Sequence, residues 1–317
     1  AIATESNGVT VEPWDLSTGQ KTTGEPLKLK TRPASKFAIS TDGKRIAWVA
    51  TFPKHSVQVW SFDTGKATMA IDWEAARGDP ELIGFSAPNR LLLRWGNTSA
   101  SADIDVVNVD AKARVATFKV NQLQGKHPIA VSPAAQRLLV ASKVKGIPTL
   151  IQYDLNDGQP ILYTKIVDLD PALPVDARGL AYSNDGKRMA IYIENPEGAL
   201  LVSYDSDGSQ KPVSLVYPDG PTPGVAHDNF ADNALTSLDP SPCWLIYGDA
   251  VIDAKTNDVL ANLGVKNVIA NRVLDNDHVE LVTSDGSKVQ VKVATIDRSK
   301  LQALTATPTP APQVSLH

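Results

Sequence analysis

The sequence has little cysteine, and this limits the kinds of site that the chain can build. Cys243 stands alone among 317 residues, which excludes an internal disulfide framework and a cysteine-rich metal site. It neighbours Trp244 in an apolar stretch. We therefore expect Cys243 to be a buried packing residue and not a nucleophile.

Long apolar runs and an excess of positive charge are also lacking. No apolar run approaches the roughly 20 residues that a membrane-spanning helix needs, so membrane association is expected only through a partner or through a segment that precedes Ala1. The formal net charge is −4 and no basic stripe is visible, which argues against a nucleic-acid partner. A hydrophobic share of 42% and a charged share of 21% are typical of a soluble globular protein.

Catalytic signatures are lacking as well. The sequence contains no G-x-S-x-G, H-E-x-x-H or C-x-x-C motif and no glycine-rich phosphate loop. The turns 205–208 (DSDG) and 283–286 (TSDG) lack the downstream glutamate of a calcium loop. These absences favour a protein that is not an enzyme and that holds no metal or cofactor.

What the sequence does contain is a series of short strands. The stretch 36–66 predicts three of them, at Phe37–Ser40, Lys44–Ala50 and Val57–Phe62, because apolar and polar residues alternate there. Between them lie turns in which glycine supplies the positive φ angle, as in Thr41-Asp42-Gly43. This pattern indicates antiparallel strands and not helices.

A similar segment of sequence repeats along the chain. Positions equivalent to Trp60 fall at Trp14, Val107, Tyr153, Ser203, Ala250 and Lys292, with successive gaps of 46, 47, 46, 50, 47 and 42 residues. A second marker, the turn after the first strand of each unit, repeats in phase. An all-strand unit of about 46 residues with four apolar segments is typical of a propeller blade. We therefore predict an all-β, seven-bladed β-propeller of four-stranded antiparallel blades over residues 1–306.

The units resemble the blades of WD-repeat and WD-repeat-like propellers. The residues that carry the resemblance are Ser40–Ile46 and Ser183–Met189 (S-x-D-G-K-R), Val57–Lys66 (V-x-V-W-x-x-x-T-G-K) and the pair Trp14-Asp15. The Gly-His pair of the strict family is not repeated, so the degenerate bacterial propellers fit better. That resemblance implies a scaffold for protein–protein interactions. With the single cysteine and a first residue that is not Met, it favours the cell envelope or periplasm over the cytoplasm. Either a leader was removed or the chain is a piece of a longer protein.

The two ends of the repeat are less regular than its middle. The last unit offers strands near Val268–Leu274, His278–Thr283, Lys288–Thr295 and Leu301–Thr305, whereas the first lacks its innermost strand. An open propeller would leave an unpaired edge. Two alternatives can close it: the Pro-rich tail 307–317 leads Val314–Leu316 into the slot, or residues upstream of Ala1 supply the strand. Otherwise the tail is a plain linker.

Binding residues are expected on the face with the longer connections. The turns after first and third strands are short, whereas the second-to-third loops and the links between blades are longer and irregular, and function tends to lie on such loops. The candidate partner-binding residues on that face are Trp73, Asp79, Glu81, His127, Asp176, Arg178, His227, Asp228, Phe230 and Asp232. The cluster in loop 217–233 is also compatible with a solvated loop rich in turn formers.

Three functions remain open on the sequence alone. The preferred one is a non-enzymatic scaffold that binds a protein partner or a larger complex. The second is a metal-dependent hydrolase or lactonase with its site at the channel mouth, around His127, Arg178 and His227. The third is an assembly subunit that uses its Pro-rich tail as a tether.

Overall fold

The structure is a computed structural model of the chain. It describes residues 2–5, 8–11, 14–15, 20–21, 27–29, 33–50, 56–72, 78, 80–96, 101–124, 129–166, 176–183, 186–195, 198–208, 213–217, 235–240, 243–247, 249–253, 258–273, 277–284 and 289–301. Of the strands in these ranges, all pairs that are formed are antiparallel. The chain is therefore all-β, as the alternating sequence predicts.

The middle of the chain forms five four-stranded sheets, each built from strands that are consecutive in sequence. The first two are Pro33–Ile39 (β6), Arg45–Ala50 (β7), Ser56–Ser61 (β8) and Lys66–Asp72 (β9), followed by Glu81–Ala87 (β10), Arg90–Trp95 (β11), Ser101–Asn108 (β12) and Ala113–Asn121 (β13). The third is Ile129–Ser132 (β14), Arg137–Val144 (β15), Ile147–Asp154 (β16) and Pro160–Lys165 (β17). The fourth and fifth are Asp176–Tyr182 (β18), Arg188–Asn195 (β19), Gly198–Asp205 (β20) and Val213–Tyr217 (β21), then Leu235–Pro240 (β22), Cys243–Tyr247 (β23), Ala250–Asp253 (β24) and Val259–Asn262 (β25).

The two ends of the chain form smaller sheets in the described ranges. At the N-terminal end Ile2–Glu5 (β1), Gly8–Val11 (β2) and Leu27–Leu29 (β5) make a three-stranded sheet, and Trp14–Asp15 (β3) pairs with Gln20–Lys21 (β4). At the C-terminal end Val268–Val273 (β26), His278–Ser284 (β27) and Val289–Thr295 (β28) make another three-stranded sheet. The expectation of four strands in every unit is thus met in the five middle sheets and not in the described parts of the first and last.

The three strands predicted between residues 36 and 66 are confirmed as β6, β7 and β8. The turns after β6 and β8 each contain a glycine in the left-handed region, where other residues are strained. The φ angles of Gly43 and Gly65 are 72° and 61°. The central strand β7 is buried along nearly its whole length, because it has a paired neighbour on each side and a packed layer on each face.

The prediction of a fourth strand in the last unit, near Leu301–Thr305, is wrong at Leu301, where the chain is helical. Residues 298–301 form one helical turn. Asp297 begins it, because its Oδ1 accepts the backbone N–H of Lys300 at 3.0 Å and its carbonyl accepts that of Leu301 at 3.1 Å. Ile296 and Leu301 are buried in a cluster with Trp244, which this short turn allows and an extended chain would not.

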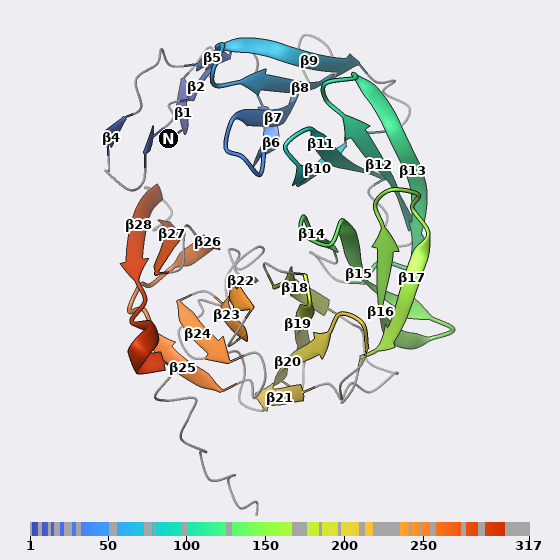
Figure 1. The fold of residues 1–317 in the computed structure, drawn as a ribbon, viewed down its shortest axis with the longest axis vertical. Helices are drawn as coiled ribbons and strands as arrows, with labels where there is room; N and C mark the ends of the chain where they lie inside the picture. The colour runs from blue at the N-terminus through green and yellow to red at the C-terminus, as the bar shows by residue number, and fades with distance from the viewer. Residues whose placement is uncertain are drawn as a thin grey trace, which may run out of the picture. The chain divides into compact units, whose positions relative to one another are not determined.

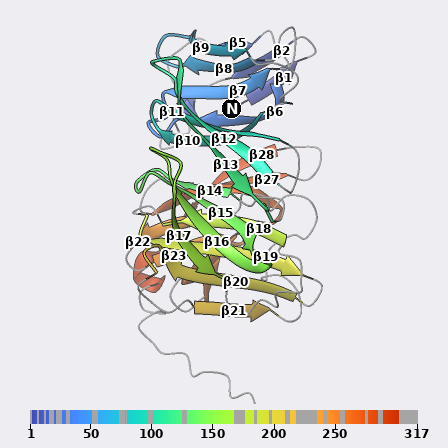
Figure 2. The ribbon, with the colours of Figure 1, turned by 90° about the vertical axis from the view of Figure 1, so that its right-hand side faces the viewer.

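The chain divides into two compact units. The first comprises residues 1–123, 129–144 and 150–163, and the second 124–128, 145–149 and 164–317. In the first unit the opening strands β6, β10 and β14 contact one another in sequence, and in the second β18, β22 and β26 do so. Figure 1 shows the order within a sheet: β6 lies beside β10, and β7, β8 and β9 follow outward. The same order, from β18 to β21, is visible in Figure 2.

The core of the first unit lies between successive sheets. One face of sheet β6–β9 packs on sheet β10–β13 through a cluster that includes Val57, Met69, Phe85 and Leu93. Its opposite face carries Trp48 and Trp60, whose ring centroids are 5.8 Å apart. Trp48 is fully buried and Trp60 partly so, so both pack on the faces of the sheet, as expected for strand tryptophans.

Candidate functional site

Each sheet has two ends with different connections. We call the end with the connections after its first and third strands the turn side, and the opposite end the loop side. In a four-stranded antiparallel sheet these two connections necessarily lie at the same end. The turn side is well described in the first unit. Its hydrogen bonds and ion pairs show which of its side chains are already used within the protein.

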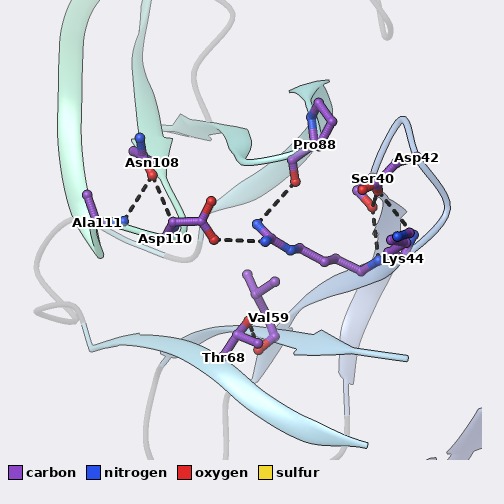
Figure 3. Close-up of polar contacts among 10 residues, drawn as sticks. Ser40, Asp42, Lys44, Val59, Thr68, Pro88, Asn108, Asp110 and Ala111 are labelled. Carbon is purple, nitrogen blue, oxygen red and sulfur yellow. Dashed lines mark hydrogen bonds and ion pairs between the residues drawn. The ribbon is translucent and has the colours of Figure 1, made fainter. Parts of the chain in front are cut away.

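Arg45, the first residue of β7, ties the turn side of its sheet to the next sheet. Its Nη2 lies 2.8 Å from Oδ1 of Asp110, and its Nη1 donates to the carbonyl oxygen of Pro88 at 3.3 Å. Figure 3 shows Pro88 and Asp110, the two partners of Arg45, together with the turn of Ser40 and Asp42. Both acceptors lie in turns of sheet β10–β13, so one side chain holds two turns of its neighbour.

The turn before Arg45 is itself tightly bonded. The Ser40 hydroxyl donates to Oδ1 of Asp42 at 2.5 Å and accepts the backbone N–H of Arg45 at 2.9 Å. The same Asp42 oxygen accepts the backbone N–H of Lys44 at 3.1 Å. The hydrogen bond from Ser40 is the main reason that the pKa of Asp42 is lowered. Ser40-Thr41-Asp42-Gly43 is therefore a turn whose carboxylate accepts hydrogen bonds from Ser40 and from the backbone.

The tie repeats one sheet later. Arg90, the first residue of β11, donates through Nη1 to Oδ1 of Asn156 at 2.7 Å and to Oε1 of Gln136 at 3.3 Å. Gln136 in turn donates to the carbonyl oxygen of Ser86 at 2.7 Å. These acceptors occupy the turns of sheet β14–β17 that correspond to those held by Arg45. The turn sides of sheets β6–β9 and β10–β13 are therefore each tied to the next sheet, through Arg45 and Arg90.

The next two arginines of the series have partners within their own sheets. Arg137 donates to Oε1 of Gln152 at 3.4 Å. Arg188 is paired with Oδ1 of Asp205 at 2.5 Å, and both of these side chains are largely buried. The strand position is the same in all four cases, since each arginine is the first residue of the second strand of its sheet.

A buried carboxylate lies in the middle of sheet β10–β13. Asp105 on β12 is 1% exposed. Its Oδ2 accepts the indole N–H of Trp95 at 2.7 Å, and its Oδ1 accepts the hydroxyl of Thr117 at 2.8 Å. Nε of Arg114 lies 3.3 Å from Oδ2. This network links three strands of one sheet and leaves the carboxylate no access to solvent, so it stabilises the sheet.

On the loop side, Glu81 is the candidate residue whose side chain is described. It opens β10, and its Oε2 accepts a hydrogen bond from Nη1 of Arg94 at 3.1 Å. The Glu81 side chain is 39% exposed and that of Arg94 is 15% exposed. Glu81 can therefore contact a partner while its position is fixed from the sheet side.

Asp176 and Arg178 open β18, also on the loop side. Arg178 is the extra residue of a β-bulge, because the pairing with β19 shifts between Ala177 and Gly179. Bulges redirect a side chain away from the regular alternation of a strand. The side chains of Asp176 and Arg178 lie outside the description, as do the remaining candidates in full: Trp73, Asp79, His127, His227, Asp228, Phe230 and Asp232.

The described ranges contain neither a metal-ligating cluster nor a membrane-spanning helix. No group of three or more His, Cys, Asp or Glu side chains that could hold a metal ion occurs among those residues. In the same ranges no helix has the length and apolar character to cross a membrane.

Comparison with known proteins identifies the type of fold. No family model matches the sequence, and no curated protein matches it in sequence. The similar solved structures include hydrazine synthase of Kuenenia stuttgartiensis, with 14% identity over 92% of this chain and 90% of that chain and a TM-score of 0.60. They also include BamB of Moraxella catarrhalis, with 10% identity over 93% of this chain and 96% of that chain and a TM-score of 0.52. Both are β-propeller proteins. The fold of this chain is a β-propeller.

The propeller fold by itself does not assign a function. Altogether 914 solved chains match this structure significantly. Propellers serve unrelated functions on one scaffold. One of the two, hydrazine synthase, is an enzyme by its name. Function must therefore be argued from the residues of this propeller.

Asp249 is a buried group of this propeller that the sequence did not single out. It lies next to β24, is 5% exposed, and accepts the backbone N–H groups of Gly264 and Val265. Its Oδ1 has no hydrogen-bond partner among the described residues. Burial raises the pKa of Asp249 above its ordinary value of 3.8, against the opposing effect of the backbone donors.

The substitution Asp249→Asn tests this burial. Because the folded-state pKa is raised, the stability that Asp249 contributes is present when it is protonated and is lost as the pH rises through that pKa. The amide has one oxygen for the backbone donors and no charge, so we expect the variant to be more stable than the natural protein at neutral pH, by roughly 1 kcal/mol.

The measurement is denaturant unfolding of both proteins at several pH values. The difference should shrink as the pH falls and vanish below the ordinary pKa of 3.8. A difference that is independent of pH would contradict the assignment.

Proposed function

We propose that this propeller is a non-enzymatic scaffold that binds a protein partner through its loop side. The observation that carries the proposal is that Arg45 and Arg90 on the turn side are used for ties between sheets. That use leaves the opposite ends of the strands for recognition. Glu81, half-exposed and held by Arg94, and the bulged Arg178 stand at those ends.

The proposal includes the finer architecture. Seven blades of the WD-repeat-like kind are supported by the five four-stranded sheets together with the two three-stranded sheets at the chain ends. The partner is a protein or a larger complex, which the chain joins as an assembly subunit. A location of the protein in the cell envelope or periplasm agrees with this role.

The test is recovery of a specific partner from the source cells by a tagged chain. We expect Arg178→Ala combined with Asp228→Ala to lower recovery at least tenfold, because polar and charged side chains at an interface hot spot typically cost about 2 kcal/mol or more when truncated. The matched control is Lys44→Ala combined with Asp63→Ala on the turn side, where the two exposed side chains lie 4.0 Å apart. Equal loss in both variants, with unchanged thermal melting, would contradict loop-side binding.

Elemental analysis separates this proposal from the metal-dependent hydrolase. A stoichiometric divalent metal in the purified full chain, lost with His127→Ala or His227→Ala, would favour the enzyme. A scaffold is expected to carry none and to bind its partner after treatment with a chelator.

A further inference from the structure

One connection on the loop side is a tight two-residue turn. Strand β15 ends at Val144 and strand β16 begins at Ile147, so Lys145 and Gly146 alone join them. The φ angles of these two residues are 51° and 81°, and a positive φ at both central residues is typical of a type I′ turn. Among the second-to-third connections from β7 onward, it is the one whose residues are all described. We call residues 145–147 the hairpin tip.

Lysine is an unfavourable residue for the first position of this turn. Asparagine, aspartate and glycine dominate there because they tolerate a left-handed backbone, whereas a long side chain is strained. Lys145 is exposed, so packing inside the protein does not compensate the strain. The stability of the turn therefore does not account for the lysine, whereas a contact of its ammonium group outside the chain does.

The last residue of the hairpin tip, Ile147, is a large apolar side chain that is 43% exposed. Its backbone is fixed from the strand side. Pro148 follows it, which disfavours all but extended conformations of Ile147, and the carbonyl oxygen of Ile147 accepts the hydroxyl of Thr149 at 2.8 Å. An exposed apolar side chain on a fixed backbone can bind with little loss of conformational entropy.

The carboxylates and the lysines of sheet β14–β17 lie at opposite ends. Asp154 and Asp157 are on the turn side, at and after the end of β16, and Oδ1 of each accepts a nearby backbone N–H. The lysines lie toward the loop side: Lys143, Lys145 and Lys165. Lys165 is near the start of β16, because the N–H of Ile166 donates to the carbonyl oxygen of Pro148 at 3.0 Å. The hairpin tip is thus both positive and apolar, in a chain whose net charge is −4.

We propose that the hairpin tip binds an acidic segment of the protein partner, in which carboxylates flank an apolar side chain. The apolar side chain contacts Ile147, and the carboxylates pair with Lys145 and Lys165. Charge complementarity selects an acidic partner, and the exposed apolar side chain favours a polypeptide over a uniformly charged polymer. This inference rests on the proposed loop-side function and names the chemistry of the partner there.

The test uses a fluorescein-labelled peptide with glutamates on both sides of one leucine, titrated with the full chain and followed by fluorescence anisotropy. We expect saturable binding that Lys145→Glu weakens by roughly tenfold, because repulsion replaces attraction. Ile147→Ser should weaken it too, as should a peptide with glutamines in place of the glutamates. Lys112→Glu is the matched control, since Lys112 is an exposed lysine with a φ angle of 53° on the turn side. It should leave binding unchanged.

Lys145→Asn separates binding from folding. Asparagine suits the left-handed position better than lysine, so this variant should keep or slightly raise the melting temperature while it loses affinity for the peptide. A natural chain that does not bind the peptide overturns the proposal. So does a folded Lys145→Asn chain that binds as tightly as the natural one, or an equal loss with Lys112→Glu. Binding of phosphatidylglycerol vesicles or single-stranded DNA through Lys145, without binding of the peptide, overturns it in favour of another polyanion.

Recovery of the partner from the source cells distinguishes this failure from failure of the loop-side function. If Lys145→Glu leaves recovery unchanged while Arg178→Ala combined with Asp228→Ala lowers it, the loop side binds a partner and the hairpin tip takes no part. If neither variant lowers recovery, the loop-side function itself fails.

Discussion

Replacing Asp105 by alanine is expected to lower the free energy of unfolding by about 3 kcal/mol, because it leaves a buried donor without an acceptor. The indole N–H of Trp95 loses its partner in a site that is 4% exposed at Trp95 and 1% at Asp105. Arg114, by contrast, is half exposed and regains water, so its loss adds little. Denaturant unfolding monitored by tryptophan fluorescence gives the difference.

Two further variants assign the cost to the Trp95 bond. Trp95→Phe removes the donor, so Asp105→Ala should cost less in the Trp95→Phe background than in the natural protein. Arg114→Ala should cost well under 1 kcal/mol, as expected for a half-exposed ion pair. Strict additivity of Asp105→Ala and Trp95→Phe would contradict the network.

The middle strands could be predicted from sequence because their signals are local. The strand predicted over Lys44–Ala50 is β7, Arg45–Ala50, to within one residue. Alternation with period two, closed by Asp-Gly and Thr-Gly turns, depends on neighbouring residues alone. The prediction over Leu301–Thr305 is wrong at Leu301, the one residue of it that the structure describes, because an apolar residue fits both a strand and a helical turn. The cap at Asp297 and packing against Trp244 favour the helical turn.

The candidate site could be predicted only as far as the loop side. That Glu81 pairs with Arg94 was not predictable, because simple alternation from the turn at Pro88-Asn89 would place Glu81 opposite Gly96. Two shifts of register, at Leu82/Gly84 and Phe85/Ala87, move it to Arg94. The arginine ties also escaped prediction. The arginine is visible in the S-x-D-G-K-R motif, but its acceptors lie 43 or more residues away on another sheet.

The buried carboxylates differ in how far the sequence reveals them. Asp105 interrupts the apolar run of β12, Ile104 to Val107, and a charged residue inside a buried strand is a signal that a pairing network exists. Asp249 follows a glycine in a turn, where aspartate is common for local reasons. Nothing local distinguishes it from the solvated aspartates of other turns, so its burial had to come from the structure.

Replacing Gly158 by alanine is expected to lower the free energy of unfolding by about 3 kcal/mol, from left-handed strain and from overpacking together. Gly158 has a φ angle of 73°, and a Cβ atom there would lie 2.5 Å from Cδ1 and 2.6 Å from Cβ of Phe118. Phe118 cannot move aside freely because it is buried against Tyr153. Thermal or denaturant unfolding measures the loss.

Gly43 supplies the matched control for this prediction. Its φ angle of 72° is nearly the same, but a Cβ atom there meets nothing within 4 Å. Gly43→Ala should therefore cost only the backbone strain, about 1 kcal/mol. The difference between the two glycines measures how tightly the turn of sheet β14–β17 packs on Phe118 of sheet β10–β13. Phe118→Leu should reduce the cost of Gly158→Ala and leave that of Gly43→Ala unchanged. Equal losses at the two glycines would mean that Phe118 yields, and that the two sheets are held chiefly by the tie from Arg90 to Asn156.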